Sequence, residues 1–172
     1  MISGKNIFLK GLNPKERKQI KGWGKDPEIA RFTEIYEKPK KKLKVVAFGI
    51  HDKASLKLIG DIAISSIDLK NRHAEIGLTI GDKNYWGKGY GMDSVKTATN
   101  YCFNKLNLNK VYLDVWEDNK KAIRCYNKCG FKIDGILRKH VKKGKRYYNK
   151  IIMSILKQEW NTPRDKANIR WK

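Results

Sequence analysis

The feature that most constrains the fold is a strictly alternating segment, HAEIGLTIG at residues 73–81, with the glycine-rich loop YWGKGYG close behind it. Its even positions are all apolar, whereas its odd positions are polar or small. A period of two predicts a β-strand with one face in the core, and it places Glu75 and Thr79 together on the other face. Apolar side chains then recur at helical spacing over 92–106. The loop therefore joins a strand to the start of a helix.

Three glycines alternate in this loop, at Gly87, Gly89 and Gly91. Glycine is favoured where the backbone turns left-handed or lies close against a ligand. Free amides at the start of a helix, after a glycine-rich turn, form an anion site, so we expect a phosphate or pyrophosphate here. The spacing matches neither the Walker pattern nor the dinucleotide fingerprint. A tight connection without a ligand is the alternative that the loop leaves open.

The remaining segments predict a mixed α/β domain over 1–157, followed by a polar tail at 158–172. A basic connector is expected at 38–44, and a turn at 51–55. We expect strands at 6–10, 45–50, 58–67 and 111–116, helices over 14–34 (broken near 22–27) and 118–131, and a closing antiparallel pair at 132–141 and 147–156.

Cysteine content and hydropathy restrict the setting of the protein. The chain has three cysteines, an odd and small number that is typical of a reducing compartment. No apolar run approaches the roughly 18 residues of a membrane span, and the N-terminus has no signal-peptide pattern. We therefore expect a cytoplasmic protein with no membrane partner. Cys125 and Cys129 alone do not make a zinc site, so no metal is expected.

The charge balance bears on partners. Lys and Arg total 39 against 17 Asp and Glu, a net charge of +22. Such a surface attracts polyanions such as RNA or the ribosome, although a lysine-biased proteome would give the same composition. Both readings stay open. The charge makes a polycationic substrate less favourable, since the sequence has few acidic clusters: the clearest is at 117–119, and Glu34 and Glu37 stand apart from it.

Strand, glycine loop, helix, the strand VYLDVWEDN and the helix KKAIRCYNKCGF occur in that order, and this combination resembles the GNAT family of acetyl-CoA-dependent N-acetyltransferases. The resemblance covers residues 6–157 and is sharpest over 73–131. It implies an α/β fold whose mostly antiparallel, twisted sheet is splayed at a cofactor cleft and flanked by helices. Trp86 stands where the family loop has Gln or Arg. That Trp and the ending MSILKQEW look like the branch of ribosomal-protein alanine/serine N-terminal acetyltransferases.

The resemblance also implies which residues bind acetyl-CoA, the expected cosubstrate. Backbone amides of the loop would bind the pyrophosphate, and one strand edge would pair with the pantetheine arm. Asn119 would touch the same arm, or would only cap the helix that follows it. The expected contacts are Leu78, Thr79 and Ile80 on the strand, and Trp86, Gly87, Lys88, Gly89, Tyr90 and Gly91 in the loop.

Two side chains are the expected catalytic residues. Tyr126 falls on the family's Tyr, whose phenol, with a pKa of about 10, can protonate the departing thiolate. Its alternative role is to fill the core face of its helix. Glu75 is the candidate base, directly or through water. Its alternative is an ordinary strand Glu that pairs with a cross-strand lysine.

The implied activity is transfer of an acetyl group to a primary amine by direct attack. A protein N-terminus or ribosome-linked amine is the first expectation, and the alternative is a small-molecule amine: an amino sugar, amino acid, antibiotic or polyamine. A reading of another class is a non-catalytic, basic module that binds RNA or a ribosome. Acceptor specificity is expected from residues 20–40 and 138–148. A monomer and a homodimer are both open.

Overall fold

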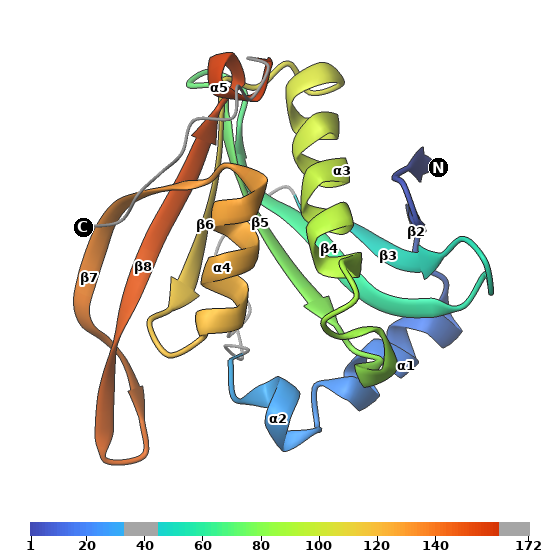
Figure 1. Ribbon diagram of the computed structural model, residues 1–172, viewed down its shortest axis with the longest axis horizontal. Coiled ribbons are helices and arrows are strands. Elements are labelled where there is room, and N and C mark those ends of the chain that lie inside the picture. The colour runs from blue at the N-terminus through green and yellow to red at the C-terminus, as the bar shows by residue number, and fades with distance from the viewer. Residues whose placement is uncertain (33–44, 162–172) are drawn as a thin grey trace.

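The computed structural model describes residues 1–32 and 45–161, so the expected connector at 38–44, with Glu34 and Glu37, lies outside the described residues. Within those ranges one sheet runs in the order β1-β2-β3-β4-β5-β6-β8-β7 (Figure 1). Neighbouring strands are antiparallel except for β5 and β6, which are parallel. The strands are β1 (Ile2–Ser3), β2 (Ile7–Gly11), β3 (Val46–Asp52), β4 (Leu58–Asp68), β5 (His73–Ile80), β6 (Lys110–Trp116), β7 (Lys132–Lys143) and β8 (Arg146–Leu156).

Helices α3 (Tyr90–Asn104) and α4 (Lys120–Cys129) lie side by side over one face of the sheet (Figure 1). The helical stretch expected over 14–34 is broken where predicted: α1 (Pro14–Trp23) ends at Gly24, and α2 (Pro27–Ala30) follows the cap Asp26. A short 3-10 helix, η1 (Lys83–Tyr85), precedes the glycine loop.

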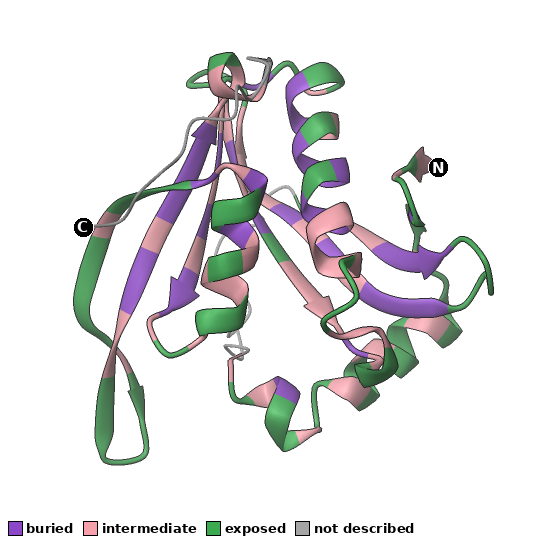
Figure 2. Cartoon of the chain, viewed as in Figure 1, coloured by how far each residue is buried: buried purple, intermediate pink, exposed green. Residues whose placement is uncertain are grey.

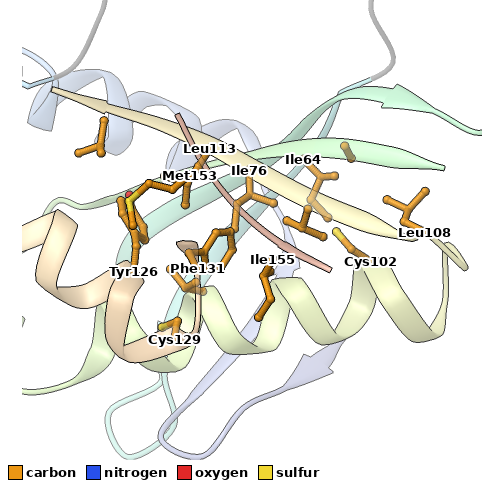
Figure 3. Packing of buried hydrophobic residues seen from close by; sticks show 14 of the residues in the cluster. Ile64, Ile76, Cys102, Leu108, Leu113, Tyr126, Cys129, Phe131, Met153 and Ile155 are labelled. Atoms are coloured by element: carbon orange, nitrogen blue, oxygen red, sulfur yellow. The ribbon is translucent and has the colours of Figure 1, made fainter. Parts of the chain in front are cut away.

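The larger core cluster lies between the sheet and helices α3 and α4. Figure 2 shows the buried residues concentrated in the strands beneath these helices, whereas β7 is mostly exposed. The alternation predicted for 73–81 is confirmed, because Ala74 and Ile76 are buried in this cluster. Figure 3 shows how side chains from the strands and from α3 and α4 meet there, among them Ile76, Leu113, Cys102, Tyr126 and Met153.

Strands β5 and β6 form a fork. Their pairing covers three residues of each strand, from His73 opposite Lys110 to Glu75 opposite Tyr112. Beyond that point the strands diverge (Figure 1), while β5 stays paired with β4 and β6 with β8. Facing backbone edges are thereby left open to one another from Ile76 and Leu113 onward. The predicted splay of a mostly antiparallel sheet is confirmed.

His51 is placed differently from the prediction of a turn at 51–55. It lies in β3 with 1% of its surface exposed, and its Nε2 is 2.9 Å from a carboxylate oxygen of Glu16 on α1. Phe8 stacks on its ring with 4.9 Å between the centroids. This pairing satisfies the imidazole and allows burial, so the strand extends to Asp52.

The C-terminal region begins with regular structure. Residues Lys157–Asn161 form the short helix α5, which the prediction of a polar tail from 158 did not include. Glu159 accepts a hydrogen bond from the amide of Leu156 and pairs with Lys132. Residues 162–172 lie outside the described residues, and the domain boundary at 157 stays a prediction.

Candidate active site

The glycine loop presents the start of α3 to a ligand. Gly87 and Gly89 have positive φ angles of 73° and 87°, a conformation that side chains disfavour. Gly89 is the N-cap of α3 and forms no side-chain hydrogen bond to the helix. The first amides of α3 therefore have no cap, and the helix dipole adds positive potential at the same point. This arrangement fits the pyrophosphate of acetyl-CoA.

Trp86 ties the loop to the sheet. Its indole N–H donates a 2.7 Å hydrogen bond to the carbonyl of Ile80, the last residue of β5. The ammonium groups of Lys83 and Lys121 lie 5.7 and 5.8 Å from its ring centroid. A Trp can thus hold the loop by a backbone contact and gather two cations beside the anion site.

The edge of β5 that faces the fork carries the expected pantetheine contacts. Leu78, Thr79 and Ile80 are each paired with β4 on their other side. The carbonyl of Ile80 already accepts a hydrogen bond from Trp86. The residues of this edge that lie nearer the fork therefore remain available to pair with the pantetheine arm. A Cβ at Gly91 would lie 3.9 Å from Ile80, an ordinary contact, so this position requires no glycine.

Other expected cofactor residues have additional roles. The hydroxyl of Tyr90 donates to Asp52 at 3.1 Å, so any contribution of Tyr90 to the loop comes from its backbone. Lys88 is exposed and lines a cavity of about 360 Å³ together with Asp52 and Lys57. Asn119 caps α4 by accepting from the amide of Ala122 at 3.2 Å. Its contact with the cofactor remains a prediction.

Tyr126 belongs to the core, as its alternative role required. It is 8% exposed and packs with Met153 and Phe131 between α4 and the strands (Figure 3). Burial raises the pKa of its phenol, and the nearby Cys125 and Asp114 raise it further. The phenol therefore stays protonated at neutral pH, which a proton donor requires. Its catalytic role stays a prediction.

Glu75 lies on the face of β5 that the parity predicted, at the last paired position before the fork. Its carboxylate accepts a hydrogen bond from the hydroxyl of Ser66 at 3.1 Å. Ser66 has a positive φ of 50°, in an irregular stretch of β4 between Ser65 and Asp68. The irregular strand thus directs a hydroxyl toward the candidate base.

The same face of the sheet carries Asp114, Lys150 and Trp116, which the sequence analysis missed, beside Phe32 and Tyr148, which lie in the ranges expected to set acceptor specificity. Asp114 on β6 forms a 3.1 Å ion pair with the buried Lys150 of β8. Trp116 stacks on Tyr148 at 5.4 Å and meets Phe32 edge-on at 6.4 Å. The alternation of VYLDVW was a sufficient signal, because it places the Asp and the Trp opposite the apolar positions.

The sequence analysis also missed Asp61. It stands between the buried Gly60 and Ile62 of β4 and faces away from the main core. Burial raises the pKa of its carboxyl to about 6. An acidic residue inside the apolar run LIGDIAI was the signal in the sequence.

Of the other histidines and cysteines, none builds a metal centre in the part of the chain that the structure covers. No three His, Cys, Asp or Glu side chains gather there as a metal site would need. Cys102 and Cys129 are buried thiols, and Cys125 is half-buried. None of the described helices is long and apolar enough to cross a membrane.

Comparison with known proteins identifies the family. The model of the acetyltransferase (GNAT) domain matches residues 8–132. The uncharacterized N-acetyltransferase p20 of Bacillus licheniformis is 34% identical over 113 residues, which are 66% of this chain and 63% of that protein. The spermidine N(1)-acetyltransferase of Escherichia coli K12 is 28% identical over 170 residues, covering 93% of this chain and 91% of that enzyme.

A solved structure has the same architecture over nearly its whole length. It is the spermidine N-acetyltransferase of Vibrio cholerae in complex with CoA and spermine. The TM-score is 0.80 at 28% identity, with 90% of this chain and 98% of that chain covered. The fork and the glycine loop described above therefore occur in a fold that accommodates CoA. The chain belongs to the GNAT family of acetyltransferases and is an acetyl-CoA-dependent N-acetyltransferase.

Proposed function

We propose that the acceptor is a polyamine and that the protein acetylates one of its primary amines. The relatives that match nearly the full chain are spermidine acetyltransferases, which favours the small-molecule alternative over the protein N-terminus expected first from the sequence. The single structural observation that carries the proposal is the distribution of acid. In a chain of net charge +22, three carboxylates face the same side of the sheet: Glu75 and Asp114 on the two strands of the fork, and Asp61 on the neighbouring β4.

The chemistry divides between the two faces of the sheet. Acetyl-CoA supplies the acetyl group as a thioester, held by the glycine loop and the open edge of β5. An amine attacks a thioester only in its neutral form, and most amines are protonated near pH 7. Glu75, beside the fork, is positioned to accept that proton directly or through water. We assign protonation of the departing thiolate to Tyr126; its raised pKa keeps the phenol protonated until transfer but makes it a weaker acid than an exposed tyrosine.

The ribosomal and RNA-binding readings have less support. Both rested on the basic surface and on the branch resemblance, and the relatives described here share neither name nor stated partner with them. Lys150 pairs with Asp114 on this side of the sheet, whereas no ion pair with a lysine is found for Asp61 in residues 1–32 and 45–161, which leaves that carboxylate for a cation. The sequence has few acidic clusters, but the sheet brings Asp61 and Glu75 to the same side of two adjacent strands.

The test is an acetyl-transfer assay with a panel of acceptors at fixed acetyl-CoA. It compares spermidine and spermine with glucosamine, with free amino acids and with a peptide that begins in Ala or Ser. We expect the highest kcat/KM for the polyamines, and loss of turnover in Glu75→Gln. A preference for the peptide would restore the first expectation. Absence of turnover on every acceptor, in a protein that binds acetyl-CoA, would reject the polyamine proposal.

A further inference from the structure

The face of the sheet opposite α3 and α4 carries a strip of small side chains between two carboxylates. Because Ile62 and Ile64 of β4 point into the core, the residues that alternate with them face the other way. The register then sets three pairs across β4 and β5 on this face. We call this set the acidic strip: Asp61 opposite Thr79, Ala63 opposite Gly77, and Ser65 opposite Glu75.

The middle of the acidic strip is open. Within residues 1–32 and 45–161, no atom lies within 4 Å of a Cβ built at Gly77, and Gly77 is exposed. Ala63 beside it adds only a methyl group. A ligand can therefore lie along the strip between its two ends without displacing any side chain that the structure describes.

Asp61 closes one end of the strip. On its β3 side the space over Gly49 is filled by His51, Leu58 and Leu12, whose side chains lie within 3 Å of a Cβ built at that glycine. No hydrogen bond or ion pair reaches Asp61 from residues 1–32 or 45–161. A half-buried carboxylate without a donor is unfavourable, and burial raises its pKa to about 6. The group that would satisfy it is a cation that arrives from the strip.

Trp23 forms a wall at the same end. Gly81 follows Thr79 on this face, and a Cβ built there would lie 2.1 Å from the Trp23 ring. The indole ring of Trp23, the last residue of α1, therefore packs directly against the backbone of Gly81. A carboxylate beside an aromatic ring suits an alkylammonium, because the ring contacts both the methylene groups and the charge.

The opposite end lies at the fork. Glu75 is opposite Tyr112 in the last pair before β5 and β6 diverge, where the acceptor nitrogen must approach the acetyl group. Asp61 is one strand away and four residues further along, which places the two Cα atoms about 14 Å apart. Asp61 is thus too far from the fork to handle the reacting amine, and its role concerns the rest of the acceptor.

We infer that Asp61 binds the distal ammonium group of the polyamine and so selects long acceptors over short ones. This inference rests on the proposed function. Extended spermidine spans about 11 Å between its terminal nitrogens, at roughly 1.2 Å per chain bond, which suits two carboxylates with their side chains reaching inward. Putrescine spans only about 6 Å by the same measure and cannot reach both ends. Asp61 is therefore a specificity-determining residue, separate from the chemistry at Glu75.

The test measures kcat and KM for spermidine, putrescine and butylamine in the wild type and in Asp61→Asn. The amide keeps the shape and removes the charge. We expect the KM for spermidine to rise about 10- to 100-fold, the loss typical of a charge-assisted contact, with kcat nearly unchanged. The constants for putrescine and butylamine should change less than about twofold, because neither reaches Asp61. Asp134→Asn is the matched control, since it makes the same change at an exposed carboxylate on β7, which is separated from β5 by β6 and β8 in the sheet order.

A second pair of variants tests the strip without touching a carboxylate. Gly77→Ala adds only a methyl group in open space and should leave the KM for spermidine nearly unchanged, whereas Gly77→Leu should raise it by blocking the middle. An unchanged spermidine KM in both Asp61→Asn and Gly77→Leu, with polyamine turnover intact, would overturn the inference and leave the proposed function standing. Failure of the wild type to acetylate any polyamine would remove both together.

Discussion

The indole N–H of Trp86 donates to the main-chain carbonyl of Ile80 across 2.7 Å, and this bond joins the glycine loop to the end of the cofactor strand. It fixes the distance between the first amides of α3 and the open edge of β5. Two lysines, Lys83 from η1 and Lys121 from α4, meet over the same ring. One side chain therefore connects three elements around the expected pyrophosphate site.

Replacement of this Trp should weaken cofactor binding more than it weakens the fold. Trp86→Phe keeps an aromatic ring for the lysines but removes the hydrogen bond, which is worth about 1 kcal/mol. We expect the Kd for acetyl-CoA to rise roughly fivefold, with a change in Tm of a few degrees at most. Isothermal titration with CoA measures the first quantity and calorimetry the second. An unchanged Kd would mean that the loop keeps its position without the bond.

Tyr126 offers a separate test of the leaving-group step. Tyr126→Phe removes only the hydroxyl, so the packing against Met153 and Phe131 is kept and unfolding should change by less than about 1 kcal/mol. If the phenol protonates the thiolate, kcat should fall about 100-fold or more while the Kd for acetyl-CoA is nearly constant. Tyr101→Phe, at a half-buried tyrosine of α3 that packs against the same core cluster, is the matched control. A kcat within twofold of the wild type would assign Tyr126 to the core alone.

The sequence alone was sufficient for the fold around the loop, because local patterns determine it. The alternation at 73–81 predicted the buried Ala74 and Ile76, and Gly130 ends α4 at a positive φ of 99° as its position indicated. Gly89 likewise adopts the left-handed conformation expected of the loop. In each case a few consecutive residues both favour the local conformation and make it recognisable in the sequence.

The face of the sheet opposite α3 and α4 was harder to predict, because the neighbours of each residue there depend on the register between strands. Asp61 lies opposite Thr79 only through the β4–β5 pairing, and Asp114 faces the same side of the sheet as Glu75 only through the short parallel contact of β5 and β6. These residues are far apart in sequence, so their convergence has no local signature. The same holds for His51, whose burial depends on Glu16 from another element.

The ion pair of Asp114 and Lys150 should show asymmetric mutational costs. The Lys150 side chain is 7% exposed and the Asp114 side chain 24%, so loss of the acid leaves a buried ammonium, while loss of the lysine leaves a carboxylate that water can reach. We expect Asp114→Asn to destabilise by about 1–3 kcal/mol. Lys150→Met should cost less, because it also restores apolar packing. Urea unfolding at pH 7 measures both, and equal costs would contradict this account.

Asp61 predicts a dependence of stability on pH with a definite sign. Its pKa is raised from 3.8 to about 6 in the folded protein, so the folded state holds the proton more tightly than the unfolded one. Its contribution to stability is then complete below pH 3.8 and is lost as the pH rises through about 6. Asp61→Asn cannot ionise, so it should be more stable than the wild type by about 1–3 kcal/mol at pH 7, with the difference vanishing near pH 4.

Glu16 provides the control of opposite sign. Burial acts to raise its pKa, but hydrogen bonds from the amide of Asn13, from His51 and from Lys10 outweigh burial and lower it. Its contribution is present above the ordinary value of 4.5 and is lost as the pH falls below it. Glu16→Gln should therefore lose stability relative to the wild type at pH 7 and approach it in acid. Unfolding curves of the wild type and both variants between about pH 2 and 8 measure the two trends. Parallel curves for Asp61→Asn and the wild type would show that water reaches Asp61 freely, and would remove the reason to expect a cation there.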